Sequence, residues 1–109
     1  MSHETYAACI ETCNACAAAC NHCAASCLAE QDVKMMAKCI ALDIDCAAVC
    51  QLASAAMARG SDHAVAICRL CAEICKACGD ECARHEAQHC KDCAEACHRC
   101  AEACLAMVH

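Results

Sequence analysis

The amino-acid sequence predicts an all-α protein, an antiparallel four-helix bundle with a cysteine-lined core. The chain of 109 residues contains 19 cysteines and no proline, so nothing in it forbids long helices. The cysteines recur at alternating spacings of three and four, which is the spacing of the buried seam of a packed helix. Four such segments with short connections indicate one bundle domain that spans residues 1–109.

The first two helices are predicted from their cysteine seams and from the residues that flank them. The first spans about residues 3–30, with Ser2 as a candidate N-terminal cap. The second spans about residues 33–59, with Asp32 as its candidate cap. Gly60 follows the second seam and is the residue type that most often ends a helix, so we expect it to be the C-terminal cap.

The third and fourth helices are separated by a break in the cysteine rhythm. The third is predicted over residues 62–84, and the interval from Cys82 to Cys90 is one residue longer than a heptad. We therefore expect a tight turn near His85–Glu86 and a fourth helix over residues 87–107. A continuous helix through this segment is the alternative, because it contains neither glycine nor proline.

Composition and charge exclude several classes of partner. The formal net charge of −6 argues against nucleic acid, and acidic and basic residues alternate as on a solvated face. No uninterrupted run of about 18 apolar residues is present, so no membrane span is expected. The N-terminal residues show neither a basic region nor a separate apolar stretch. We therefore expect a cytoplasmic protein without a secretion signal.

The cysteines are better explained as metal ligands than as disulfides. The cytosol keeps thiols reduced, and an odd count leaves one thiol unpaired. Residues three or four apart on a helix have Cβ atoms about 5–6 Å apart. A disulfide prefers a Cβ separation of about 3.5–4.5 Å, so bridges within one seam would be strained.

All 19 cysteines are therefore candidate metal ligands. They are Cys9, Cys13, Cys16, Cys20, Cys23, Cys27, Cys39, Cys46, Cys50, Cys68, Cys71, Cys75, Cys78, Cys82, Cys90, Cys93, Cys97, Cys100 and Cys104.

Three further side chains are candidate ligands. Asp43 falls on the inward face of the second helix, as a ligand or as the partner of a nearby histidine or backbone group. His85 and His89 lie at the last turn, beside Cys82 and Cys90. There they either pass a metal ion into or out of the bundle, since imidazole binds copper, or serve as solvated residues at helix ends.

Charge indicates which metal such a core would hold. Ionised thiolates in a core are costly unless their charge is compensated. One Cu(I) per thiolate leaves no net charge, and Cu(I) favours soft sulfur ligands. Zinc bound by four thiolates would leave two negative charges at every site. Multiple Cu(I) ions are therefore the favoured cargo. Zinc or another soft metal, and a thiol redox buffer, are the alternatives.

Two stretches of sequence carry a family resemblance. With the cysteine ladders of all four helices, HCKDCAEAC at residues 89–97 and CAEAC at residues 100–104 resemble the cysteine-rich copper storage proteins of bacteria. The resemblance implies a four-helix bundle filled with Cu(I), usually a homotetramer, that stores copper without catalysis. Storage of this kind sequesters and detoxifies copper and can supply copper enzymes.

The same resemblance distinguishes two branches of the family. Exported members carry a twin-arginine signal, and cytosolic members lack one. This sequence shows no such signal, so it resembles the cytosolic branch. The second helix has only three cysteines, so a lower density of copper is expected beside Asp43.

Overall fold

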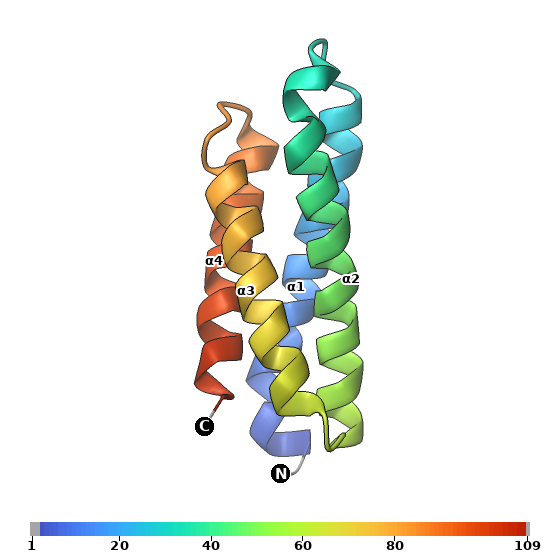
Figure 1. Cartoon of the computed structure of the whole chain (residues 1–109), viewed down its shortest axis with the longest axis vertical. Helices are drawn as coiled ribbons and strands as arrows, with labels where there is room; N and C mark the ends of the chain where they lie inside the picture. The colour runs from blue at the N-terminus through green and yellow to red at the C-terminus, as the bar shows by residue number, and fades with distance from the viewer. Residues whose placement is uncertain (1–2, 109) are drawn as a thin grey trace.

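The computed structural model describes the backbone of residues 3–108 and the side chains from Tyr6 onward, so the expected cap Ser2 lies outside the described residues. Within residues 3–108 the chain forms helices and turns and no strand (Figure 1). The elements are α1 (His3–Leu28), the short 3-10 helix η1 (Val33–Met36), α2 (Ala37–Arg59), α3 (Ala64–Cys82) and α4 (Gln88–Ala106).

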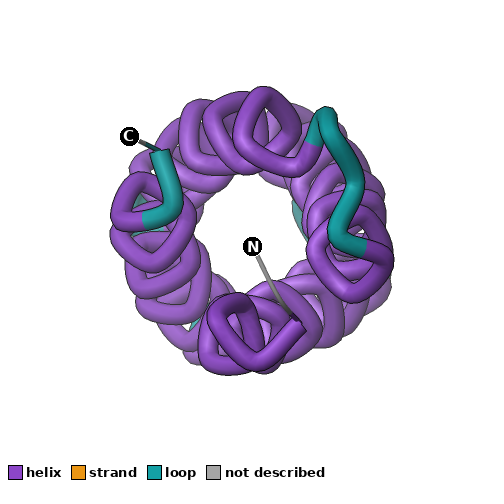
Figure 2. The backbone as a smooth tube through the Cα atoms, turned by 90° about the horizontal axis from the view of Figure 1, so that it is seen from below, coloured by secondary structure: helices purple, strands orange, loops and turns teal. Residues whose placement is uncertain are grey.

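The four helices form an antiparallel bundle, which confirms the predicted fold class. Each long helix packs against two others, in the order α1, α2, α3, α4 and back to α1. Figure 2 shows the resulting ring of four rods seen along the bundle. The Cα atoms extend over 46 × 18 × 17 Å. The α2–α3 connection and both ends of the described chain lie at one end of the rod, and the other two connections lie at the opposite end.

The observed helix ends differ from the expected ones where the chain turns. α1 ends at Leu28, and α2 begins at Ala37, after η1. The side chain of Asp32 makes no capping hydrogen bond, and the residue before α2 is Met36, so the prediction that Asp32 caps this helix was wrong. The 3-10 helix tightens the chain after the turn and takes the place of a side-chain cap. The chain is non-helical between Cys82 and Gln88, which excludes the continuous helix.

Gly60 ends α2 as the sequence predicts. Its φ of 66° and ψ of 38° place it in the left-handed region, which side chains with a Cβ rarely adopt. Its N–H donates to the carbonyl of Met57 at 3.1 Å, and the N–H of Ser61 donates to the carbonyl of Ala56 at 2.9 Å. These bonds satisfy carbonyl groups that the end of the helix would otherwise leave unpaired.

The second helix carries apolar side chains on its inner and its outer face. By length and composition, Val33–Arg59 is the single candidate membrane span among the described residues, with a mean hydropathy of 1.5 over its best window. This differs from the expectation that the sequence holds none. Half of that window is buried inside the bundle, as in the core helix of a soluble protein. The outer face of the helix also carries apolar side chains, among them the exposed Ile44 and Leu52.

We predict that Gly60→Ala lowers the free energy of unfolding of the reduced, metal-free protein. A left-handed conformation costs a residue with a Cβ about 1–2 kcal/mol. Gly60→Asn is the matched control, because asparagine adopts the left-handed conformation more readily than alanine does. We expect it to lower the free energy of unfolding by less than Gly60→Ala does. Chemical denaturation followed by circular dichroism measures both. Equal losses for the two variants would contradict this account of the cap.

Candidate metal centre

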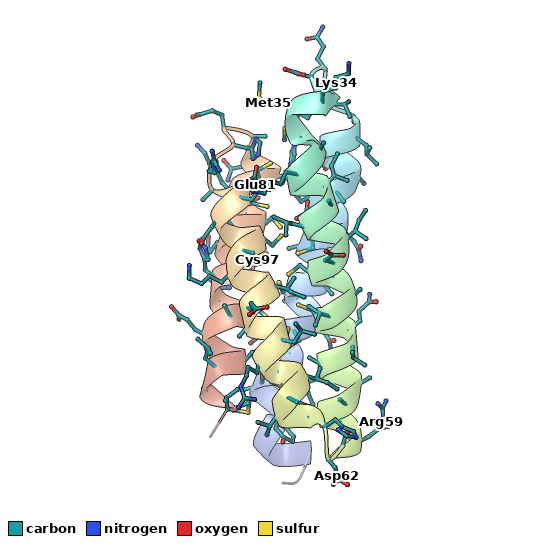
Figure 3. All side chains as sticks on the ribbon, viewed as in Figure 1. Lys34, Met35, Arg59, Asp62, Glu81 and Cys97 are labelled. Carbon is teal, nitrogen blue, oxygen red and sulfur yellow. The ribbon has the colours of Figure 1, made fainter. Side chains whose placement is uncertain are left out.

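Every cysteine of the chain faces the axis of the bundle. Cys9 is 3% exposed and the other 18 are fully buried, and all 19 are free thiols. The sulfur atoms lie between the helices in Figure 3, where Cys97 marks the middle of their row. The helices turn their cysteines inward because a spacing of three and four keeps one face of a helix toward its neighbours.

The sulfur atoms make many contacts with one another, most of which cross between helices. The shortest separations are 3.3 Å between Cys39 and Cys82 and 3.4 Å between Cys46 and Cys75. A disulfide bond is about 2.05 Å long, so these pairs are close but not bonded. Contacts within one helix also occur, as between Cys71 and Cys75 at 3.7 Å. Most of the sulfurs therefore have partners across the core, and four pairs also touch along one helix.

Several groups of four sulfur atoms lie within 4.8 Å of one another. Five of these groups are Cys13/Cys71/Cys100/Cys104, Cys16/Cys46/Cys50/Cys75, Cys16/Cys20/Cys46/Cys97, Cys20/Cys78/Cys93/Cys97 and Cys23/Cys27/Cys39/Cys90. Neighbouring groups in the middle share members, so they join into a row. Two metal–sulfur bonds of about 2.3 Å span about 4.6 Å when collinear and about 4.0 Å in a trigonal site. The separations suit ions bound by two or three sulfurs.

The core holds no buried positive side chain to balance ionised thiolates. Among the described residues, the buried charged or polar side chains are Asp43 and Glu81, and both are acidic. Burial raises the pKa of the Cys27 thiol above its ordinary value and that of Cys90 to about 11. These thiols therefore keep their protons at neutral pH in the metal-free protein, and a cation must displace the protons as it binds.

Asp43 lies among thiols and not beside a histidine. The thiols of Cys78, Cys93 and Cys82 donate to its Oδ1 at 3.2, 3.3 and 3.5 Å, and that of Cys39 to its Oδ2 at 3.9 Å. Its side-chain hydrogen-bond partners are all thiols, so the expected pairing with a histidine is not seen among the described residues. Burial is the main cause that raises its pKa to about 10, so the carboxyl is neutral at pH 7.

His89 is in contact with the outer end of the sulfur row. Its Nδ1 lies 3.5 Å from the sulfur of Cys23, 3.6 Å from that of Cys90 and 3.9 Å from that of Cys27. Its Nε2 lies 2.8 Å from Oε1 of Glu30. The ring is therefore placed between the thiol core and a carboxylate at the surface.

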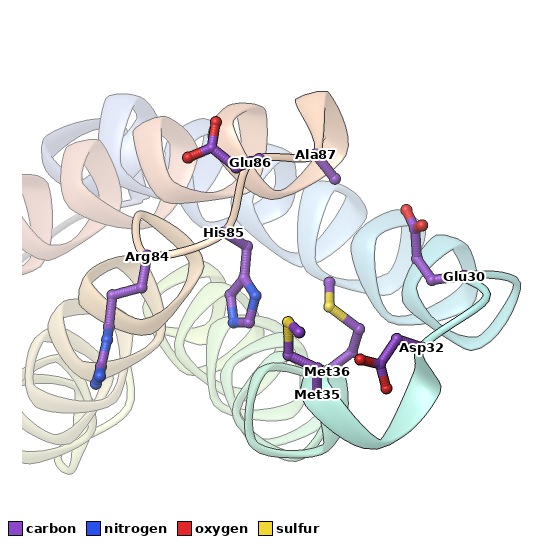
Figure 4. Close-up of a pocket in the computed structure, with 8 residues that line it drawn as sticks. All are labelled: Glu30, Asp32, Met35, Met36, Arg84, His85, Glu86 and Ala87. Carbon is purple, nitrogen blue, oxygen red and sulfur yellow. The ribbon is translucent and has the colours of Figure 1, made fainter.

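His85 stands apart from the sulfurs. Its Nε2 lies 2.9 Å from Oε2 of Glu81, one helical turn earlier on the chain. It borders an open cavity of about 240 Å³ at the end of the bundle, which Met35, Met36 and Glu30 also line. Figure 4 shows the His85 ring and the thioethers of both methionines facing this opening. We call this cavity the vestibule.

The two histidines that were predicted together at the last turn thus have different surroundings. His89 contacts sulfur, and His85 faces the vestibule. The carboxylates Glu81 and Glu30, which hold the rings, were missed by sequence reasoning. Glu81 could have been found from its spacing of four from His85 on a helix. Glu30 lies 59 residues from His89, and no local pattern links them.

Buried side chains close the opposite end of the row. Tyr6 is 4% exposed, and Met57 and Ala64 are buried with it in the same core cluster as Cys9. These residues come from the ends of α1, α2 and α3 that meet beside the α2–α3 connection. One end of the sulfur row is therefore covered by these side chains. The other end lies near the vestibule, where His89 contacts Cys23 and is held by Glu30 of the vestibule wall.

Known proteins resemble the chain over its whole length. The sequence profile of the copper storage protein family matches residues 2–109. The structure of Cu(I)-bound copper storage protein BsCsp3, from Bacillus subtilis, is 48% identical with a TM-score of 0.92, and the alignment covers 95% of this chain and 98% of that one. A search of curated protein sequences found no significant match.

Two further structures come from Streptomyces lividans. Its cytosolic copper storage protein loaded with five coppers is 46% identical with a TM-score of 0.93, and 97% of this chain and 93% of that one are covered. The Ccsp protein loaded with ten copper equivalents is 45% identical with a TM-score of 0.92, and the coverage is 96% and 84%.

We predict that Asp43→Asn stabilises the reduced, metal-free protein and that the gain grows with pH. The folded protein keeps a proton on Asp43 up to about pH 10, whereas the unfolded chain loses it near its ordinary value of 3.8. The stability that Asp43 contributes is therefore complete below pH 4 and falls as the pH rises toward 10, by at most about 1.4 kcal/mol per pH unit. Asparagine does not titrate. Anaerobic denaturation of both proteins at pH 5 and pH 7.5 tests this, and an equal difference at both values would refute it.

Proposed function

The chain belongs to the copper storage protein family, and we propose that it stores many Cu(I) ions in its thiol core without catalysing a reaction. The observation that carries this proposal is the row of 19 buried, free sulfur atoms with no buried positive side chain beside it in the described part of the chain. Its proposed ligands are the 19 cysteines, with Asp43 and His89 as additional ligands within and at the end of the row.

Charge balance supports Cu(I) as the cargo. When a Cu(I) ion replaces the proton of a thiol, the proton leaves to solvent and the core stays neutral. Zinc could fit the groups of four sulfurs by distance, but it would bury two negative charges at each site. No lysine or arginine is buried among the described residues to offset that charge. The cost of uncompensated charge in a core therefore favours the monovalent ion.

Burial disfavours the competing role of a thiol redox buffer. A reactive redox cysteine is at least partly exposed and has a lowered pKa. Here 18 of the 19 thiols are fully buried, and Cys9 is 3% exposed. Oxidants and partner thiols thus have little access to the sulfurs unless the bundle opens.

Copper passes through the end of the bundle that carries the vestibule. Imidazole and thioether groups both bind Cu(I), and the vestibule presents His85, Met35 and Met36 to solvent and core. His89 is held by Glu30 of the vestibule wall and contacts Cys23 and Cys90, so it lies between the vestibule and the sulfurs. We place the protein in the cytoplasm, as in the S. lividans relative that is described as cytosolic.

The outer face of α2 supports association of several copies. Ala37, Ala41, Ile44, Ala48, Leu52 and Ala55 are exposed and follow one another at spacings of three and four. Ile44 is 58% exposed and Leu52 is 48% exposed. Antiparallel packing of two copies of α2 about Ala48 would set Ile44 of one copy opposite Leu52 of the other, with alanines that allow close approach. We propose this face as one interface of the homotetramer that the family resemblance implies.

We predict that the reduced protein binds well over ten Cu(I) ions per chain. An anaerobic titration against a chromophoric Cu(I) chelator measures the capacity, and a weakly buffered indicator measures the protons released. We expect about one proton for each thiolate that binds copper, because burial, with no buried positive side chain among the described residues, favours the protonated thiol. Excess Zn(II) should not reduce the Cu(I) capacity. Saturation at four or five equivalents, or displacement of Cu(I) by Zn(II), would overturn the proposal.

We predict that the double variant Ile44→Glu/Leu52→Glu forms smaller assemblies than the natural sequence. Carboxylates on this apolar face would be desolvated on association, which disfavours the interface. Ala18→Glu adds a charge at an exposed position of α1 and serves as the control. Sedimentation velocity at tens of micromolar protein compares the three. An unchanged mass for the double variant would exclude this face as an interface.

A further inference from the structure

Glu30 holds His89 in one orientation, although it comes from a distant part of the chain. It follows α1 in the connection to α2, where its N–H donates to the carbonyl of Cys27 at 3.1 Å. Its side chain is 41% exposed, whereas that of His89 is 15% exposed. The carboxylate thus forms part of the vestibule wall and reaches inward to the edge of a largely buried ring.

The two contacts of the ring decide which nitrogen carries the proton. A carboxylate only accepts hydrogen bonds, so the Nε2 that faces Glu30 must be the donor. A neutral imidazole has a single N–H, so its Nδ1 is left with a free lone pair. This Nδ1 is the atom that faces the sulfurs of Cys23, Cys27 and Cys90 at 3.5–3.9 Å.

We propose that Glu30 is a positioning residue for copper uptake, which fixes His89 as the Nε2–H tautomer with Nδ1 aimed at the outermost thiols. In this form Nδ1 can bind a Cu(I) ion that arrives from the vestibule and hold it next to Cys23, Cys27 and Cys90. Histidine ligands of metals characteristically donate their second N–H to such a carboxylate. This inference rests on the proposed storage of Cu(I).

His85 does not share this role, even though a carboxylate holds it in the same way. Its Nε2 also lies beside a carboxylate, that of Glu81. Glu81 is additionally surrounded by Lys38 at 4.0 Å and Arg84 at 3.7 Å, so its charge is already compensated. The structure gives His85 no contact with a core sulfur within the described residues. Of these two histidines, His89 alone joins a carboxylate at the surface to the thiol row.

A simple attraction of cations to an acidic vestibule is the competing explanation for any effect of Glu30. Asp32 tests it, because this carboxylate lines the same vestibule and makes no capping hydrogen bond. Asp32→Ala removes the same charge from the same opening without touching His89. Glu30→Gln is the conservative variant, since its amide oxygen still accepts a hydrogen bond from Nε2–H.

The first experiment is a double-mutant cycle on the rate at which reduced protein takes the first equivalent of Cu(I) from a chelator. We expect Glu30→Ala to slow this step about tenfold, the low end of losses for such carboxylates. Glu30→Gln should stay near the natural rate, and Asp32→Ala should have little effect. In a His89→Ala background, Glu30→Ala should change nothing further. The inference would be overturned if Glu30→Ala and His89→Ala slowed uptake independently and additively. It would also be overturned if Asp32→Ala slowed uptake as much as Glu30→Ala does.

The second experiment uses the metal-free protein, so it does not depend on copper. Nitrogen-15 NMR of the histidine rings should show His89 as the Nε2–H tautomer with a slowly exchanging ring proton. We expect Glu30→Ala to lose this slow exchange and Asp32→Ala to keep it. A His89 signal that is unchanged in Glu30→Ala would refute the positioning role. If the total Cu(I) capacity stays above ten equivalents in that case, the storage function stands and only this inference fails.

Discussion

The structure depends on the balance between the charge of buried thiolates and the cations that replace their protons. Eighteen fully buried cysteines and one nearly buried cysteine fill the space where a bundle normally packs leucine and isoleucine. Small, soft side chains gain less from burial than large aliphatic ones, so the empty bundle depends more on its alanine-rich helices. We expect neutral thiols to let it fold without metal, and monovalent ions could then enter without leaving net charge in the core.

The core was predictable from the sequence because cysteine spacing on a helix determines which side chains share a face. That spacing correctly placed Cys9 to Cys104 and Asp43 in the interior, and Gly60 marked the end of α2. Tertiary details were not predictable. Asp32 is of a type that often caps helices, but the 3-10 helix after it changes the start of α2. The pairing of Glu30 with His89 arises only when the bundle brings the α1–α2 connection beside the start of α4.

The second helix combines two functions in one short sequence. Its inner face supplies Cys39, Cys46 and Cys50 with Asp43, and its outer face is a stripe of alanine with Ile44 and Leu52. An outer face that is committed to neighbouring copies would leave α2 little freedom to move away from the core. The helix with the fewest thiols would then be the one that association holds most firmly, while α4 and the vestibule remain accessible to solvent.

The sulfur row is plugged by Tyr6 and Met57 at one end and adjoins the vestibule at the other. With entry through the vestibule alone, as proposed, such a row would behave as a stack in which the ion stored last is the first withdrawn. Ions near Cys23 and Cys90 would exchange with the surroundings while those near Cys9 and Cys68 stay in place. One chain would therefore hold a readily available copper supply and a long-term reserve, separated only by depth along the axis.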